Sequence, residues 1–193
     1  MLRLNSDILF EIGKKLIEDG DSDAVLRFGL SGKESWNALI KVFASVKILK
    51  LYYFYYSIGW DENCCCTFYF GSNPHSTFLM NCIGASVKNL QLFEQFPIYK
   101  QILDKISERQ QLNSIFIDPS FFSIFFSVKL LKHHSKTLKH VSIPSQCMTE
   151  ELQNLLNLES LTCLDFCGTK EFLQNFCKTT FLTLQSNMEN LCK

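Results

Sequence analysis

The chain has 193 residues, 19 Lys and Arg against 19 Asp and Glu, and 47% of its residues are hydrophobic. A chain of this length and composition can bury a sizeable core, which predicts one soluble domain or one and a half. Because the charges balance, the chain lacks the long-range field that attracts nucleic acid non-specifically. We therefore expect no nucleic-acid partner.

Two further classes are disfavoured by composition. The longest segment without a charged residue, residues 63–87, contains Asn73-Pro74-His75 and several glycines and serines, so it is unfit for a bilayer and we expect no membrane partner. Nine cysteines is an odd number, and the N-terminus lacks the continuous apolar segment of a secretory signal. Reduced thiols in a cytoplasmic or nuclear protein are the expectation.

Residues 4–43 have a helical pattern. Asn5 and Ser6 can cap a first helix, which ends at Gly20, and Asp21 to Asp23 offer caps for a second. Ser31 and Glu34 have the spacing of a capping box, which predicts the start of a third helix. The apolar stripe of this third helix contains Trp36, Leu39, Ile40 and Phe43.

Three short helices in about 40 residues are at the lower limit for independent folding, so this part should pack on something else. One interpretation is a helical cap on the following domain. The other is that part of its apolar surface docks a partner.

The helical part contains segments that carry a family resemblance. They are Leu4-Asn5-Ser6-Asp7-Ile8-Leu9-Phe10-Glu11-Ile12, Leu16, Val25-Leu26-Arg27-Phe28-Gly29-Leu30 and Trp36-Asn37-Ala38-Leu39. Together they resemble an F-box. The resemblance implies binding to a Skp-type adaptor that links the protein to a cullin-based ubiquitin ligase. The adaptor-facing residues that it implies are Leu4, Ile8, Leu9, Ile12, Leu16, Leu26 and Trp36. Asn5 replaces the usual proline of the family, and Glu34 its usual basic residue.

From residue 44 onward, the pattern apolar-x-x-apolar-x-apolar recurs at intervals close to the roughly 20 to 29 residues of leucine-rich repeats. Its occurrences are Val46/Leu49/Leu51, Cys65/Phe68/Phe70, Val87/Leu90/Leu92, Leu112/Ile115/Ile117, Leu138/Val141/Ile143, Leu161/Leu164/Phe166 and, more weakly, Thr179/Leu182/Leu184. Each occurrence predicts one strand.

The position three residues after each predicted strand should hold a side chain that hydrogen-bonds the backbone of the turn. These positions are Phe54, Asn73, Gln95, Ser120, Gln146, Thr169 and Asn187, and all except Phe54 are polar. Helical return segments are predicted from Pro97, from Asp118-Pro119 over residues 121–132, and from Thr149 over residues 149–156.

Strands that alternate with helices at this spacing predict a curved solenoid with the strands on its concave side. The alternative is an ordinary mixed α/β domain with unequal strands. In the solenoid, the outward strand positions are Lys50, Tyr69, Gln91, Phe116, Ser142 and Asp165, a mixed set that suits a protein partner. The chain ends at Lys193 without a polar capping helix, so the repeats could continue in a longer protein.

A zinc site could be built from Cys64-Cys65-Cys66, His75 and Cys82, but consecutive side chains of an extended segment point to opposite faces. Cys163 and Cys167 have no second pair of this spacing, so we expect buried cysteines and no metal. His133, His134 and His140 lie among lysines, which predicts a solvated helix end or, as the alternative, a contact with an acidic partner. No motif of nucleophilic, phosphate-binding or metal-assisted catalysis occurs.

The sequence therefore predicts an α/β protein with an F-box-like module at residues 1–43 and a leucine-rich solenoid at residues 44–193. Its expected function is that of a non-catalytic adaptor without a cofactor, which binds a Skp-type protein through the helices and an unknown target protein through the repeats. The first alternative is a plain leucine-rich-repeat interaction module with a helical cap. An enzyme of unrecognised type is the second.

Overall fold

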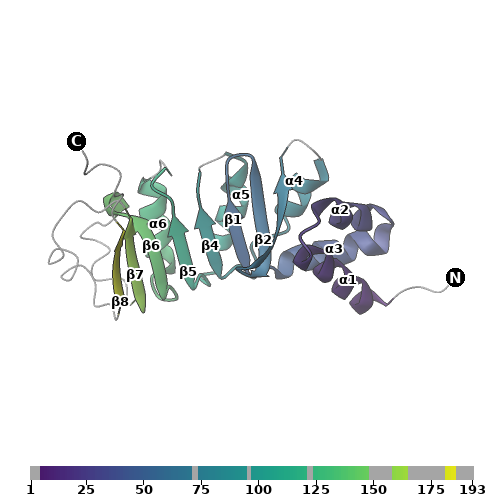
Figure 1. The fold of residues 1–193 in the computed structure, drawn as a ribbon, viewed down its shortest axis with the longest axis horizontal. Coiled ribbons are helices and arrows are strands. Elements are labelled where there is room, and N and C mark those ends of the chain that lie inside the picture. The colour runs from purple at the N-terminus through teal and green to yellow at the C-terminus, as the bar shows by residue number, and fades with distance from the viewer. Residues whose placement is uncertain are drawn as a thin grey trace. The chain divides into compact units, whose positions relative to one another are not determined.

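The computed structural model describes residues 5–70, 74–94, 97–120, 124–147, 158–164 and 181–185. It contains α-helices and a β-sheet, which confirms the mixed α/β class (Figure 1). The chain divides into two compact units. Met1–Lys88 and Phe96–Arg109 belong to the first, and Asn89–Gln95 and Gln110–Lys193 to the second.

The first unit begins with three helices, α1 (Ser6–Glu18), α2 (Ser22–Leu30) and α3 (Lys33–Ser45). Two predicted caps are confirmed: the Asn5 side chain accepts a hydrogen bond from the Asp7 backbone N–H at 3.2 Å, and that of Asp21 accepts one from Ala24 at 2.9 Å. Gly20 has a φ of 79°, a left-handed conformation that suits glycine and turns the chain between α1 and α2.

The predicted capping box at the third helix is wrong. Gly32 is the N-cap of α3, and it makes no side-chain cap hydrogen bond. The Ser31 hydroxyl instead donates to the Phe28 carbonyl at 2.7 Å, at the end of α2, and lies 3.0 Å from the Ser35 hydroxyl. Because the turn between the two helices is so short, Ser31 closes the earlier helix and does not open the later one.

Small residues allow the three helices to approach closely. Leu9, Gly13 and Ile17 form the buried face of α1. A Cβ atom on Gly13 would lie 3.2 Å from Val42 Cγ2, and one on Gly29 would lie 2.7 Å from Leu39 Cδ2. The glycines therefore set the distance of α1 and of α2 from α3.

An antiparallel meander of β1 (Ile48–Leu51), β2 (Tyr55–Asp61) and β3 (Cys64–Tyr69) follows the helices. This corrects the prediction that Cys65/Phe68/Phe70 mark a repeat strand, and the repeat pattern missed β2 altogether. Both connections are too short for parallel pairing, which needs a crossover of about a dozen residues or more. Phe54 lies in the first of these turns and is exposed.

Helix α4 (Pro74–Met80), the 3-10 turn η1 (Pro97–Tyr99) and α5 (Lys100–Ser107) complete the first unit. The helical segment predicted from Pro97 is confirmed, and it buries Ile102 and Ile106. The Tyr99 hydroxyl donates to the Tyr52 carbonyl and lies 3.0 Å from that of Tyr55, so it fastens η1 to the turn between β1 and β2.

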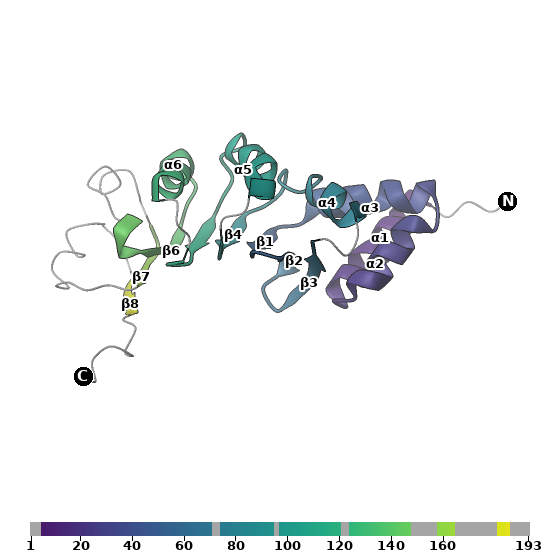
Figure 2. The same cartoon turned by 90° about the horizontal axis from the view of Figure 1, so that it is seen from above.

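The described part of the second unit contains five parallel strands whose order follows the chain, and each strand pairs with the next. They are β4 (Asn89–Leu92), β5 (Ser114–Ile117), β6 (His140–Pro144), β7 (Ser160–Leu164) and β8 (Phe181–Gln185). All five overlap segments that the repeat pattern predicted, to within one residue at the ends of β6, β7 and β8. Helix α6 (Ile124–His134) connects β5 to β6 and lies on one face of these strands, and η2 (Ser145–Cys147) follows β6 (Figure 2).

The polar-turn prediction is confirmed at Ser120, whose hydroxyl donates to the Phe93 carbonyl at 2.9 Å and thereby links the ends of two neighbouring strands. Gln146 is exposed in η2. The predicted positions Asn73, Gln95, Thr169 and Asn187 lie outside the described residues, as do Asp165 and the helix predicted over residues 149–156.

His133 and Lys136 are exposed, as the predicted solvated end of α6 requires, but His134 departs from that prediction. His134 is completely buried, and neither ring nitrogen has a hydrogen-bond partner among the described residues. Burial, with a smaller contribution from the neighbouring His133, lowers the pKa of His134 to about 4. The folded protein therefore holds this imidazole neutral.

Replacing His134 with Leu should increase stability and remove part of its dependence on pH. Since the unfolded imidazole titrates near 6.5 and the folded one near 4, the unfolded state binds more protons between these values, and stability falls as pH decreases through this window. Between pH 7 and pH 4.5 the loss amounts to about 2 kcal/mol. Urea unfolding at pH 7 and pH 4.5 would measure it. His133→Gln, an exposed neighbour, is the control and should keep the loss, and equal losses in H134L and the unmodified chain would contradict the assignment.

Replacing Gly29 with Ala should destabilise the first unit. An alanine methyl would collide with Leu39, which is fully buried, and would crowd the Trp36 ring at 3.1 Å. Overpacking of this kind costs about 1 to 3 kcal/mol, more than the roughly 1 kcal/mol that alanine gains over glycine in a helix. Gly32→Ser is the control because a Cβ atom there contacts nothing within 4 Å. Thermal unfolding would show a lower midpoint for G29A only.

Candidate partner-binding surface

An open groove of about 530 Å³ runs along α1. Its lining residues are Asp7, Ile8, Glu11, Ile12, Lys15 and Leu16. Ile8, Ile12 and Leu16 are spaced four residues apart, so their side chains follow one another along one stripe of the helix. Asp7, Glu11 and Lys15 have the same spacing and form a charged stripe beside the apolar one.

The apolar stripe is open to solvent in the middle of the groove. Ile8 is 49% exposed and Ile12 is 39% exposed, whereas Leu16 is half-buried. This stripe combines branched aliphatic side chains at helical spacing with charges along one margin. An amphipathic helix or a shallow apolar groove of another protein typically covers a surface of this kind. The arrangement can therefore bind a protein partner.

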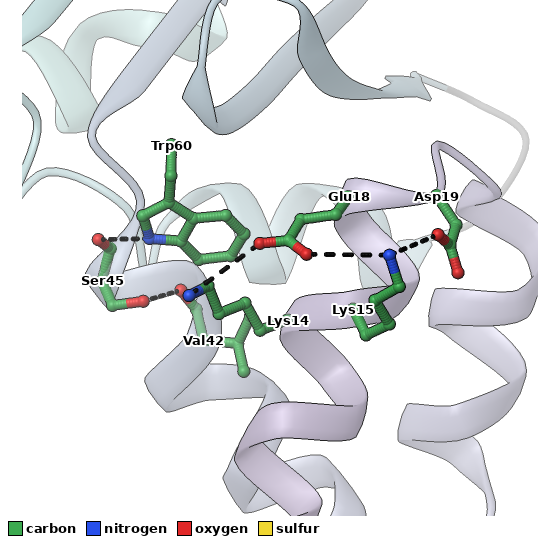
Figure 3. A network of polar contacts seen from close by, with 7 residues as sticks. All are labelled: Lys14, Lys15, Glu18, Asp19, Val42, Ser45 and Trp60. Atoms are coloured by element: carbon green, nitrogen blue, oxygen red, sulfur yellow. Dashed lines mark hydrogen bonds and ion pairs between the residues drawn. The ribbon is translucent and has the colours of Figure 1, made fainter.

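The C-terminal end of α1 is fastened to the meander and to α3 through the network of Figure 3. The Trp60 indole N–H donates to the Ser45 carbonyl at 3.1 Å, and the Ser45 hydroxyl donates to the Val42 carbonyl at 2.7 Å. Lys14 Nζ lies 5.5 Å from the centre of a Trp60 ring. Trp60, on β2, thus contacts α3 through Ser45 and α1 through Lys14.

Ion pairs lie at the same C-terminal end of α1. Lys14 lies 3.9 Å from Glu18, and Lys15 lies 4.0 Å from Glu18 and 3.1 Å from Asp19 (Figure 3). Partly exposed pairs of this kind contribute little stability, typically below about 1 kcal/mol each. The position of α1 therefore depends mainly on burial of Leu9, Gly13 and Ile17 against α3, and the groove is presented by a firmly packed helix.

The structure places the seven sequence-predicted residues differently. Ile8, Ile12 and Leu16 lie together on the groove. Leu9 and Leu26 are buried in the helical core, so their side chains are not available at the surface. Leu4 lies outside the described residues.

Trp36, the seventh, is half-buried beneath α4, a helix that the repeat pattern missed. Its ring stacks on Phe78 at 5.6 Å and meets the edge of His75 at 5.3 Å. The proline at the start of α4, preceded by Asn73, was the sequence signal for this helix. Since Trp36 also packs against the backbone at Gly29, its removal would disturb folding as well as any docking.

The buried and half-buried thiols are poorly suited to act as nucleophiles. Burial raises the pKa of Cys66 to about 12, and it also raises the pKa of Cys82 and of Cys147. These three side chains therefore stay protonated near neutral pH, and a thiolate is the reactive form. Among the residues that the structure describes, no three His, Cys, Asp or Glu side chains gather in a way that could hold a metal ion.

None of the helices in the described ranges is both long and apolar enough to cross a bilayer. Comparison of the chain with protein-family models, with curated proteins and with solved structures gives no significant match. The functional argument therefore depends on the surfaces of the chain itself.

Proposed function

We propose that the protein is a non-catalytic adaptor: its N-terminal helices bind a Skp-type linker of a cullin-based ubiquitin ligase, and its strand array binds a target protein. The observation that carries this proposal is the exposed apolar stripe of α1. Burying the exposed part of Ile8 and of Ile12 against a partner would contribute about 0.5 to 1.5 kcal/mol each.

The target-binding part of the proposal takes the second unit as a short leucine-rich solenoid. Its support is that β4 to β8 are parallel and that each pairs with the next along the chain. Leu90, Ile115 and Val141 occupy equivalent buried positions on neighbouring strands. Gln91 and Phe116 follow them on the opposite face and are only half-buried. A row of side chains at fixed spacing is the usual protein-binding surface of a repeat array.

A second candidate function, a plain interaction module with a helical cap, is favoured by a separate observation. Both α1 and α2 contact β3, which lies at the end of the meander. A helix that covers an edge strand prevents that edge from pairing with another chain. In this alternative no adaptor binds the groove on α1, and the N-terminal helices serve only as a cap.

Co-purification of the chain with a Skp-type adaptor distinguishes the two candidates. The double variant Ile8→Asp/Ile12→Asp should lower adaptor capture by about tenfold or more, because two carboxylates would be desolvated where two aliphatic side chains were buried. Its stability should change by less than about 0.5 kcal/mol per site, since both side chains are exposed. Trp36 is left unchanged because it packs against α4.

The matched control is Phe125→Asp on α6, an apolar-to-acidic change at a side chain that is 85% exposed. It should leave capture unchanged. If the folded, unmodified chain captures no adaptor, the ligase proposal fails and the capped interaction module remains. Equal losses in F125D and in the double variant would also contradict the assignment to α1.

A further inference from the structure

A second surface of different chemistry lies on the second unit. A pocket of about 380 Å³ at the C-terminal end of α6, here called the α6 pocket, is lined by Gln110, Lys129, Lys132, His133, Ser135 and Lys136. Lys129, Lys132 and His133 share one face of α6, and Lys136 lies in the turn that follows. Every lining side chain that the structure describes is basic or a neutral hydrogen-bonding group.

The positive charge of the α6 pocket has no local acidic counterpart in the sequence. No Asp or Glu occurs between Asp118 and Glu150, although four lysines and three histidines do. Like charges three or four residues apart on a helix repel one another, so this face is unfavourable by itself. An anion held between them would relieve that repulsion.

Lysines elsewhere in the described chain form ion pairs with carboxylates. Lys139 pairs with Glu159 at 2.7 Å, and His140 lies 3.7 Å from the same carboxylate. Lys15 pairs with Asp19 at 3.1 Å. The lining of the α6 pocket, by contrast, includes no carboxylate among the described residues, and Lys129 and Lys136 are exposed.

We propose that the α6 pocket binds an acidic segment of a partner protein, with Lys129 and Lys136 supplying charge and Gln110 and Ser135 supplying neutral hydrogen bonds. A peptide fits better than a nucleic acid for two reasons. The basic side chains in the described lining are only three lysines and one histidine, and the chain as a whole has no net charge, so it lacks the extended positive field that follows a phosphate backbone. The site is independent of the groove on α1, because its lining residues come only from the second unit.

The test uses the full chain and a fluorescein-labelled octaglutamate peptide, with octaglutamine as the uncharged probe, in fluorescence anisotropy. The unmodified chain should bind octaglutamate saturably and should not bind octaglutamine. Affinity should fall about tenfold or more in Lys129→Gln/Lys136→Gln. It should also weaken as salt rises from 50 mM to 500 mM, because the exposed charges become screened.

The control variant Lys88→Gln/Lys100→Gln removes the same charge from two exposed lysines of the first unit and should keep full affinity. Circular dichroism would establish that both variants fold. Three results would overturn the proposal: no binding by the folded chain, an equal loss of affinity in both variants, or tighter binding of a labelled single-stranded oligonucleotide than of octaglutamate.

Discussion

The packing of α1 against α3 determines which side chains of the N-terminal helices reach solvent. Leu9, Gly13 and Ile17 face α3, and the absence of a side chain at Gly13 allows the two helices to approach. Neighbouring residues of a helix point about 100° apart, so burial of Leu9 turns Ile8 toward the margin of the core. Ile8 and Ile12 are accordingly partly exposed, and Leu16 is half-buried.

The same packing makes the two interpretations of these helices, as a cap and as a docking surface, compatible. Contacts of α1 and α2 with β3 cover one end of the meander, while the groove along α1 remains open. One helix can therefore protect an edge strand and present a partner surface at the same time, because the two tasks use different faces. Burial of Leu9 indicates that the module is a structural part of its unit, and exposure of Ile8 leaves the docking role possible.

Local chemistry in the sequence predicted much of this fold. Asn5 and Asp21 cap their helices as expected, since a cap depends on its nearest backbone amides. The apolar spacing located all five parallel strands, since each must place two side chains in a common core. β2 was missed although Tyr55, Ile58 and Trp60 have that spacing, because it follows β1 too soon for a repeat of roughly 20 to 29 residues. β3 was then assigned to the repeat series although a short turn forces it to be antiparallel.

The candidate surfaces were less predictable because they depend on tertiary contacts. The helical period alone placed Leu9 beside Ile8, and only packing on α3 separates a core residue from an exposed one. Trp36 is half-covered by α4, which approaches it from almost 40 residues further along the chain. His134 follows a basic, soluble-looking stretch and is nevertheless buried, since it follows Leu130 and Leu131 onto the inner face of α6.

The chain has no net charge, but the charged side chains around the two proposed surfaces differ. Near α1, the cations have acidic neighbours one turn away, so the groove presents mainly apolar area whose burial is insensitive to salt. The described lining of the α6 pocket is basic or neutral and includes no carboxylate, and exposed charges of this kind act over about 10 Å at 0.1 M salt. An overall charge of zero therefore excludes long-range attraction of a polyanion, and it leaves a short acidic segment free to be recognised at close range.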